Sequence, residues 1–142
     1  MLKNIPQMIA PELMKDMMEM GHSDVLILAD ANFPAASHAR KIIRMGTVEI
    51  PEILQAVLQF FPLDSFVEKP VKLMKNLPEE PVPQIWSVYE KILKEHDSTH
   101  AFQQFGFIER LQFYEDAEKA YVIVQTGTTA RYANIMLQKG VV

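Results

Sequence analysis

The feature that most constrains the fold is a run of apolar residues, Val25–Ala29, between two polar segments. Gly21–Asp24 precede this run, and Asp30–Pro34 follow it. An unbroken apolar run of this length predicts a strand buried on both faces, and such a strand needs helices on each side of its sheet. The sequence therefore favours an α/β fold that holds His22 and Asp30 in loops, where binding and catalytic residues concentrate.

The rest of the chain alternates between helical and strand-like patterns. Helical spacing of apolar residues predicts helices at 11–20, 51–61, 84–96 and 113–119. Apolar or alternating runs predict strands at 24–29, 66–74, 102–108, 121–125 and 131–137, and 35–50 reads as loop and short strand. The chain has 142 residues and no internal repeat or linker. We therefore expect a single domain with three layers, α/β/α, in which closely spaced C-terminal strands make the sheet mixed.

Composition excludes several classes of function. The net charge is −4 and the Lys and Arg residues are scattered, which argues against a nucleic-acid partner. No apolar run approaches the roughly 20 residues of a membrane-spanning helix, and Met1–Pro6 do not resemble a signal peptide. The chain has no Cys, so disulfides and thiolate metal sites are impossible, which fits a cytoplasmic location.

His22 is the strongest candidate for chemistry because an imidazole titrates near neutral pH and can both give and take a proton. Asp30 follows the buried run, at the edge where open α/β sheets bind ligands. An ordinary reading stays open, in which His22 is solvated and Asp24 caps a turn. His22, His38 and Asp30 lack the close spacing of a metal motif, so no metal site is predicted.

Three further residues are candidates for ligand binding. The donors of Arg110 could bind hydroxyl oxygens, or the residue could pair with a neighbouring carboxylate such as Glu109. Tyr132 and Asn134 are two apart on a predicted strand, so they would share a face. A buried Asn needs hydrogen-bond partners, and a sugar or another substrate is one kind of partner.

Other motifs are weak or absent. Gly-x-Gly-x-x-Gly, the Walker phosphate loop and the Gly-x-Ser-x-Gly elbow do not occur, so no cofactor or hydrolase triad is predicted. His38, Arg40, Lys41 and Arg44 are spaced closely enough for a cationic face, although a solvated run of charges explains them more simply.

Several segments, taken in order, resemble the fucose mutarotase and ribose pyranase family. The likeness spans nearly the whole chain. Its pieces are Gly21–Asp24, Leu28–Pro34, Arg110 with Phe113-Tyr114-Glu115, Thr126-Gly127, Tyr132–Ile135 and Lys139-Gly140-Val141.

The resemblance implies that residues 1–142 form one sugar mutarotase domain, an isomerase without cofactor. It implies that His22 is the proton donor and that Asp30, Arg110, Tyr132 and Asn134 bind the sugar. Family members form ring-like homo-oligomers, commonly decamers, with active sites at subunit contacts.

The expected reaction is the interconversion of the α and β anomers of L-fucose or a close relative. Arg110 beside Phe-Tyr-Glu favours the fucose branch of the family, whereas Asn32 and Ala133 depart from it, and Ala133 is more typical of the ribose branch. His22 would act as acid and base, and Asp30 would orient the imidazole or accept a sugar hydroxyl. The alternatives are a D-ribose pyranase, a non-catalytic sugar-binding subunit and a purely structural oligomer.

Overall fold

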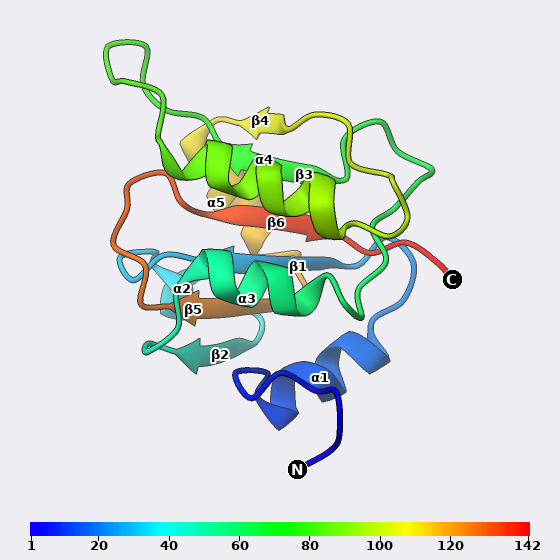
Figure 1. Ribbon diagram of the computed structural model, residues 1–142. Helices are drawn as coiled ribbons and strands as arrows, with labels where there is room; N and C mark the ends of the chain where they lie inside the picture. The colour runs from blue at the N-terminus through cyan, green and yellow to red at the C-terminus, as the bar shows by residue number, and fades with distance from the viewer.

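The computed structural model describes residues 1–142, with one six-stranded sheet in the order β2-β5-β1-β6-β3-β4 (Figure 1). The strands are β1 Val25–Ala29, β2 Ile42–Met45, β3 Val71–Met74, β4 Gly106–Ile108, β5 Val122–Thr126 and β6 Ile135–Gln138. The helices are α1 Pro11–Glu19, α2 Ala35–His38, α3 Ile50–Val57, α4 Ile85–His96 and α5 Arg110–Ala117. The predicted single-domain α/β fold with a mixed sheet is confirmed.

The sheet is parallel except for β6. β1, β2 and β5 pair in parallel, as do β3 and β4, whereas β6 runs antiparallel to both of its neighbours, β1 and β3. The carboxyl ends of five strands therefore meet at one edge of the sheet, together with the beginning of β6. The opposite edge carries the amino ends of those strands and the end of β6. We call these the carboxyl edge and the amino edge.

Side-chain alternation in β1 explains the three layers. Leu26 and Leu28 belong to the larger core, which is formed with α1, α3 and α4. Ile27 and Ala29 belong to the smaller core, with α2 and α5 on the other face. Successive strand residues point to opposite faces, so a strand that is apolar throughout is covered by helices on both sides, as Figure 1 shows.

Two of the helices on the larger core have a proline in their first turn. Pro11 and Pro51 occupy positions where the missing N–H leaves no hydrogen bond unmade. Helix α1 buries Leu13 and Met17, as the apolar spacing predicts, but Met18 is exposed. The apolar residues of α1 are therefore only partly buried in the core.

Several predicted strands are shorter in the structure. Residues 66–70 are irregular, because Pro70 cannot donate to a strand ladder, and residues 102–105 also lie outside β4. Residues 35–38 form a short helix instead of a loop. The last strand begins at Ile135, so Tyr132 and Asn134 precede it, and the prediction that they share a strand face is wrong. Tyr132 instead adopts φ 54°, in the left-handed region.

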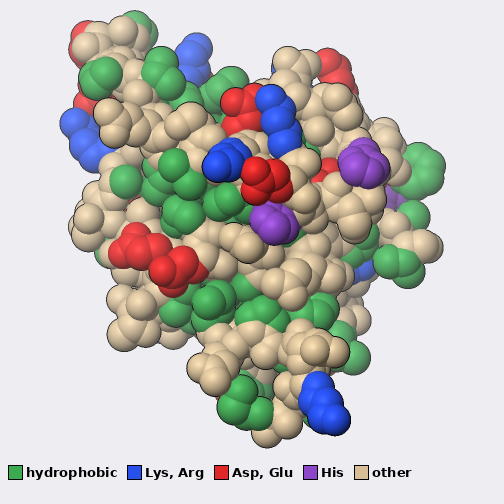
Figure 2. Space-filling model, in the orientation of Figure 1, with side chains coloured by type: hydrophobic (Ala, Val, Ile, Leu, Met, Phe, Trp, Pro, Cys, Tyr) green, Lys and Arg blue, Asp and Glu red, His purple; other side chains and the backbone are tan.

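No helix in the structure is both long and apolar enough to cross a membrane. Figure 2 views the face that carries α3 and α4, and basic side chains on this face are interspersed with acidic ones. This face therefore has no continuous basic surface of the kind that phosphate backbones need.

Gly127 lies at a close approach between two chain segments. A Cβ atom there would meet the carbonyl oxygen of Gly46 at 2.4 Å, whereas a Cβ atom on Gly46 would meet nothing within 4 Å. We expect Gly127→Ala to lower the free energy of unfolding by about 1–3 kcal/mol, because backbone must move to relieve the overlap. Gly46→Ala is the matched control, with an expected change within about 0.5 kcal/mol. Urea unfolding at fixed protein concentration measures both, and equal losses would contradict the steric explanation.

Candidate functional site

The predicted site residues fall into two groups at opposite edges of the sheet. Asp30 follows the carboxyl end of β1, and His22 precedes its amino end. The five residues of β1 span roughly 17 Å at the usual rise of a strand, which is too far for the two side chains to meet. The expectation that Asp30 orients the imidazole of His22 is therefore wrong within one chain.

Asp30 and Asn134 meet at the carboxyl edge. The Asn134 side-chain oxygen accepts the Asp30 N–H at 2.8 Å, and the Asp30 carboxylate accepts the Asn32 N–H at 2.9 Å. Asp30 and Asn134 are both buried. Burial raises the pKa of Asp30 above its usual value, although hydrogen bonds from Asn32, Asn134 and Phe33 oppose the rise. The buried amide thus has a protein partner, and it ties the start of β6 to the end of β1.

Two aromatic residues of α4 hydrogen-bond the backbone of the segment Arg131–Asn134, which we call the strap. The Trp86 indole N–H donates to the Tyr132 carbonyl at 2.8 Å, and the Tyr89 hydroxyl donates to the Ala133 carbonyl at 2.7 Å. These bonds hold the backbone where Tyr132 adopts its positive φ. A left-handed conformation is costly for a residue with a side chain, so it persists only where the surroundings determine it.

Helix α5 contributes Tyr114 and Arg110 to the same edge. Tyr114 packs edge-on against Phe33 at 5.6 Å between ring centroids. Arg110 lies four residues earlier, on the same side of the helix, and its side chain is exposed. It forms no ion pair, and its neighbour Glu109 pairs with Lys75 instead. The guanidinium is therefore available to a ligand.

A hollow of about 230 Å³ lies between these elements. Its lining includes Asp30, Asn134, Tyr132 and Tyr114, but not Arg110, which belongs to the first turn of α5. Carboxylate, amide and phenol groups converge there with the aromatic ring of Phe33. A few polar groups beside apolar surface are typical of small-molecule sites.

At the amino edge, His22 is held by Asp64. The imidazole Nε2 lies 3.2 Å from both carboxylate oxygens. The His22 side chain is 44% exposed, whereas that of Asp64 is 1% exposed. An ionised carboxylate only accepts hydrogen bonds, so Nε2 carries a proton and Nδ1 remains available to another group. The pair presents an oriented imidazole to the surface.

The Asp64 carboxylate has several hydrogen-bond donors. Burial alone would raise the pKa of Asp64, but the Phe66 N–H, His22 and Gln138 all donate to the carboxylate and bring its pKa below the usual value. The Phe66 ring lies 5.4 Å from the imidazole of His22 and is exposed. Asp64 was not predicted from the sequence, because it is 42 residues from His22 and no local motif marks it.

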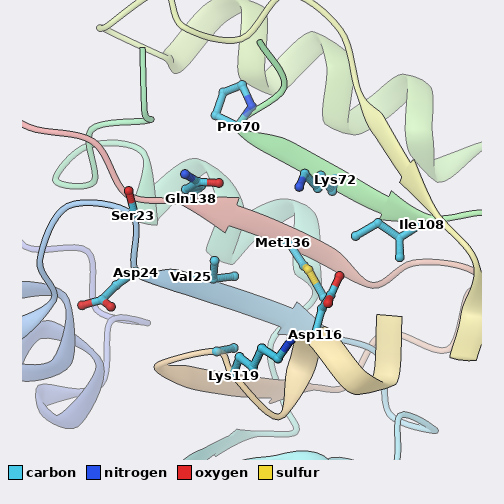
Figure 3. A pocket seen from close by; sticks show the side chains of 11 residues that line it. Ser23, Asp24, Val25, Pro70, Lys72, Ile108, Asp116, Lys119, Met136 and Gln138 are labelled. Atoms are coloured by element: carbon cyan, nitrogen blue, oxygen red, sulfur yellow. The ribbon is translucent and has the colours of Figure 1, made fainter. Parts of the chain in front are cut away.

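A second hollow, of about 310 Å³, contains none of the five predicted residues. It lies on the side of the sheet that carries α5, over β1, β6 and β3 (Figure 3). Figure 3 shows three charged side chains around it: Lys72 on β3, Asp116 on α5, and Lys119 just after α5. Gln138, which donates to Asp64, also lines this hollow, so the hollow borders the amino-edge group.

His38, Lys41 and Arg44 form separate contacts and not a single cationic face. His38 bonds Glu118 at 2.9 Å, Lys41 bonds the buried Asp16, and Arg44 bonds Gln125. His38, Lys41 and Arg44 thus each have a partner of their own. No three His, Asp or Glu side chains lie close enough to hold a metal ion.

Comparison with known proteins identifies the class. The sequence matches the RbsD/FucU transport protein family over residues 3–142, and the chain belongs to this family. It is 41% identical to a human fucose mutarotase, over 99% of this chain and 94% of that protein.

Two solved structures bear on the fold. A fucose mutarotase from Streptococcus pneumoniae, solved in complex with L-fucose, is 45% identical, superposes with a TM-score of 0.93 and is covered over 99% of each chain. Bacillus subtilis RbsD, solved with D-ribose, is 20% identical with a TM-score of 0.74 over 100% of this chain and 99% of that one, so this likeness shows the fold alone.

We expect Asp30→Asn to raise the free energy of unfolding at neutral pH. Burial raises the pKa of Asp30 above its unfolded value of about 3.9, so the ionised carboxylate costs stability above the folded pKa. That cost is absent below the unfolded pKa, and the gain should vanish as the pH falls below about 4. Urea unfolding at several pH values measures it. Glu115→Gln, at an exposed carboxyl, is the control, and a gain that persists at acid pH would contradict the burial argument.

Proposed function

We propose that this protein is a sugar mutarotase, an isomerase that interconverts the α and β anomers of L-fucose. The observation that carries the proposal is the exposed imidazole of His22, oriented by the buried carboxylate of Asp64. The likeness to proteins named fucose mutarotase, one of them solved with L-fucose, supports the choice of sugar.

Anomer exchange moves protons but needs no redox step. The bond between C1 and the ring oxygen breaks as the C1 hydroxyl loses its proton to a water molecule and the ring oxygen gains a proton from His22. The open-chain aldehyde then rotates about its C1–C2 bond and closes on its other face, with the proton movements reversed. His22 is proposed as the acid that protonates the ring oxygen and as the base on the return. Asp64 fixes the orientation of the imidazole ring through its contact with Nε2.

The carboxyl edge is proposed to hold the sugar. Asp30 accepts a sugar hydroxyl, and Asn134 and Tyr132 contact others across the hollow between β1 and the strap. Arg110 reaches in from α5 and donates to hydroxyl oxygens. Because the hollow also contains aromatic surface, it can contact the C–H groups of a monosaccharide.

Both groups can act on one sugar only if two copies of the chain meet. The carboxyl edge of one copy would supply Asp30 and the strap, and the amino edge of the next would supply His22 and Asp64. We therefore propose a homo-oligomer with shared sites, in line with the ring-like decamers that the family resemblance implies. We also propose a cytoplasmic location, which the absence of Cys suits.

We expect His22→Ala to slow anomer exchange by about 10²- to 10⁴-fold, the usual contribution of a positioned acid–base group. Saturation-difference NMR on equilibrated L-fucose measures the exchange, with D-ribose as a second substrate. His96→Ala, at a histidine in the last turn of α4, is the matched control and should exchange like wild type. Undiminished exchange in His22→Ala would exclude His22 as the acid, and faster exchange of ribose than of fucose would assign the chain to pyranase chemistry.

Mixing two inactive variants tests the shared site. His22→Ala leaves the carboxyl edge intact, and Asp30→Ala leaves the amino edge intact. Co-refolded at equal amounts, they should regain about a quarter of the wild-type exchange rate, because random neighbours assemble one intact site in four. Mixing the same proteins without refolding is the control. A co-refolded oligomer that stays inactive would contradict a site shared between two copies.

A further inference from the structure

Glu80 lies in the loop that joins β3 to α4. Figure 1 shows the course of this loop. The Asn76 amide donates to the carbonyls of Glu80 and Pro81, at 3.0 and 3.3 Å. Pro78, Pro81 and Pro83 further restrict its backbone. The loop therefore presents Glu80 from a restrained position.

The Glu80 carboxylate binds two adjacent residues of the strap. Its Oε2 accepts the hydroxyl of Tyr132, and its Oε1 accepts the Arg131 guanidinium at 2.5 Å. The Arg131 guanidinium also lies 5.5 Å from the centroid of the Tyr132 ring. The Glu80 side chain is 18% exposed, whereas that of Arg131 is 76% exposed. The bond to the phenol is therefore the more sheltered of the two, and the solvent around Arg131 weakens its ion pair.

Glu80 binds the side chain of Tyr132, whereas helix α4 binds its backbone. Trp86 holds the Tyr132 backbone through its carbonyl, and Tyr89 holds the next residue. The Tyr132 hydroxyl donates to Glu80, and a backbone hydrogen bond from Leu77 also acts on its oxygen. The Tyr132 ring lines the hollow with Asp30 and Asn134. Removing Glu80 therefore removes the acceptor of the phenol while the backbone of the strap stays in place.

The direction of this hydrogen bond determines what the phenol can offer a ligand. A tyrosine hydroxyl has one hydrogen, and donating it to Glu80 leaves only acceptor positions on the oxygen. The hydrogen bond raises the pKa of Tyr132 and lowers the pKa of Glu80, so the proton stays on the phenol. A sugar hydroxyl that meets Tyr132 must therefore act as the donor.

We propose that Glu80 is a positioning residue of the sugar site, which fixes the Tyr132 hydroxyl as a hydrogen-bond acceptor at the hollow. The inference rests on the proposed function, since it concerns how that site binds its sugar. Glu80 itself does not touch the sugar. Its effect therefore belongs mainly to binding and not to the proton transfers that are assigned to His22.

The test compares Glu80→Ala and Glu80→Gln with Glu79→Gln, a neighbouring exposed carboxyl that makes no ion pair. The dependence of exchange rate on L-fucose concentration gives kcat and KM. We expect Glu80→Ala to raise KM about ten- to hundredfold, the size of a hydrogen bond to a charged group, with a smaller change in kcat. Glu80→Gln keeps an acceptor and should restore most of the affinity. Glu79→Gln should match wild type.

A second readout follows Tyr132 without any sugar. The protein contains four tyrosines, so a ¹³Cζ-tyrosine label gives few resonances, and Tyr132→Phe assigns the one of interest. Loss of the Glu80 charge should lower the pKa of Tyr132 in both Glu80 variants, a change that general loss of packing would not produce. Glu80→Gln preserves the shape of the side chain and gives this readout even if Glu80→Ala does not fold.

The outcomes separate this inference from the proposed function. Wild-type protein that fails to accelerate exchange overturns the proposed function and the positioning role with it. Active wild-type protein whose KM is unchanged in the folded Glu80 variants overturns the inference alone. An unchanged KM together with a lowered Tyr132 pKa also overturns it, because the contact would then exist without serving binding.

Discussion

The antiparallel insertion of β6 between β1 and β3 is the constraint on which both polar groups depend. Its register pairs Leu28 with Ile135 at one end and Val25 with Gln138 at the other. At the first end, the preceding Asn134 reaches the Asp30 N–H, and at the second, Gln138 reaches the Asp64 carboxylate. A parallel strand in this place would bring the strap to the wrong edge. One strand therefore aligns two distant groups of side chains.

Each of the two groups contains a buried carboxylate, and the pKa values of these carboxylates shift in opposite directions. Asp30 has too few donors to offset its burial, so its pKa is raised and its ionised form is poorly compensated. Asp64 accepts a backbone N–H, an amide and an imidazole, and its pKa is lowered. The first carboxylate still has capacity to accept a ligand hydroxyl, whereas the second is fully engaged in holding His22. The same residue type thus keeps free acceptor capacity at one edge and orients a histidine at the other.

Sequence patterns predicted those features of the fold that depend on local periodicity. The strand predicted at 24–29 formed close to its expected bounds, and so did the helices predicted at 11–20 and 84–96. The error at Tyr132 has a physical cause. The strand-like pattern continued back to residue 131. In the structure, Trp86 and Tyr89 of α4 donate to the carbonyls of Tyr132 and Ala133, and no local pattern reveals these hydrogen bonds. Asp64 was missed because its relation to His22 exists only in the folded chain.

Opposite placement of the two groups also affects how many complete sites an assembly contains. If each site takes its halves from two copies, every copy carries one unmatched half of each kind until a neighbour covers it. An open row of copies always leaves one imidazole edge and one sugar-binding edge idle at its ends. A closed assembly leaves none, so it has as many sites as subunits. Closure would then raise the catalytic yield per chain without changing any residue.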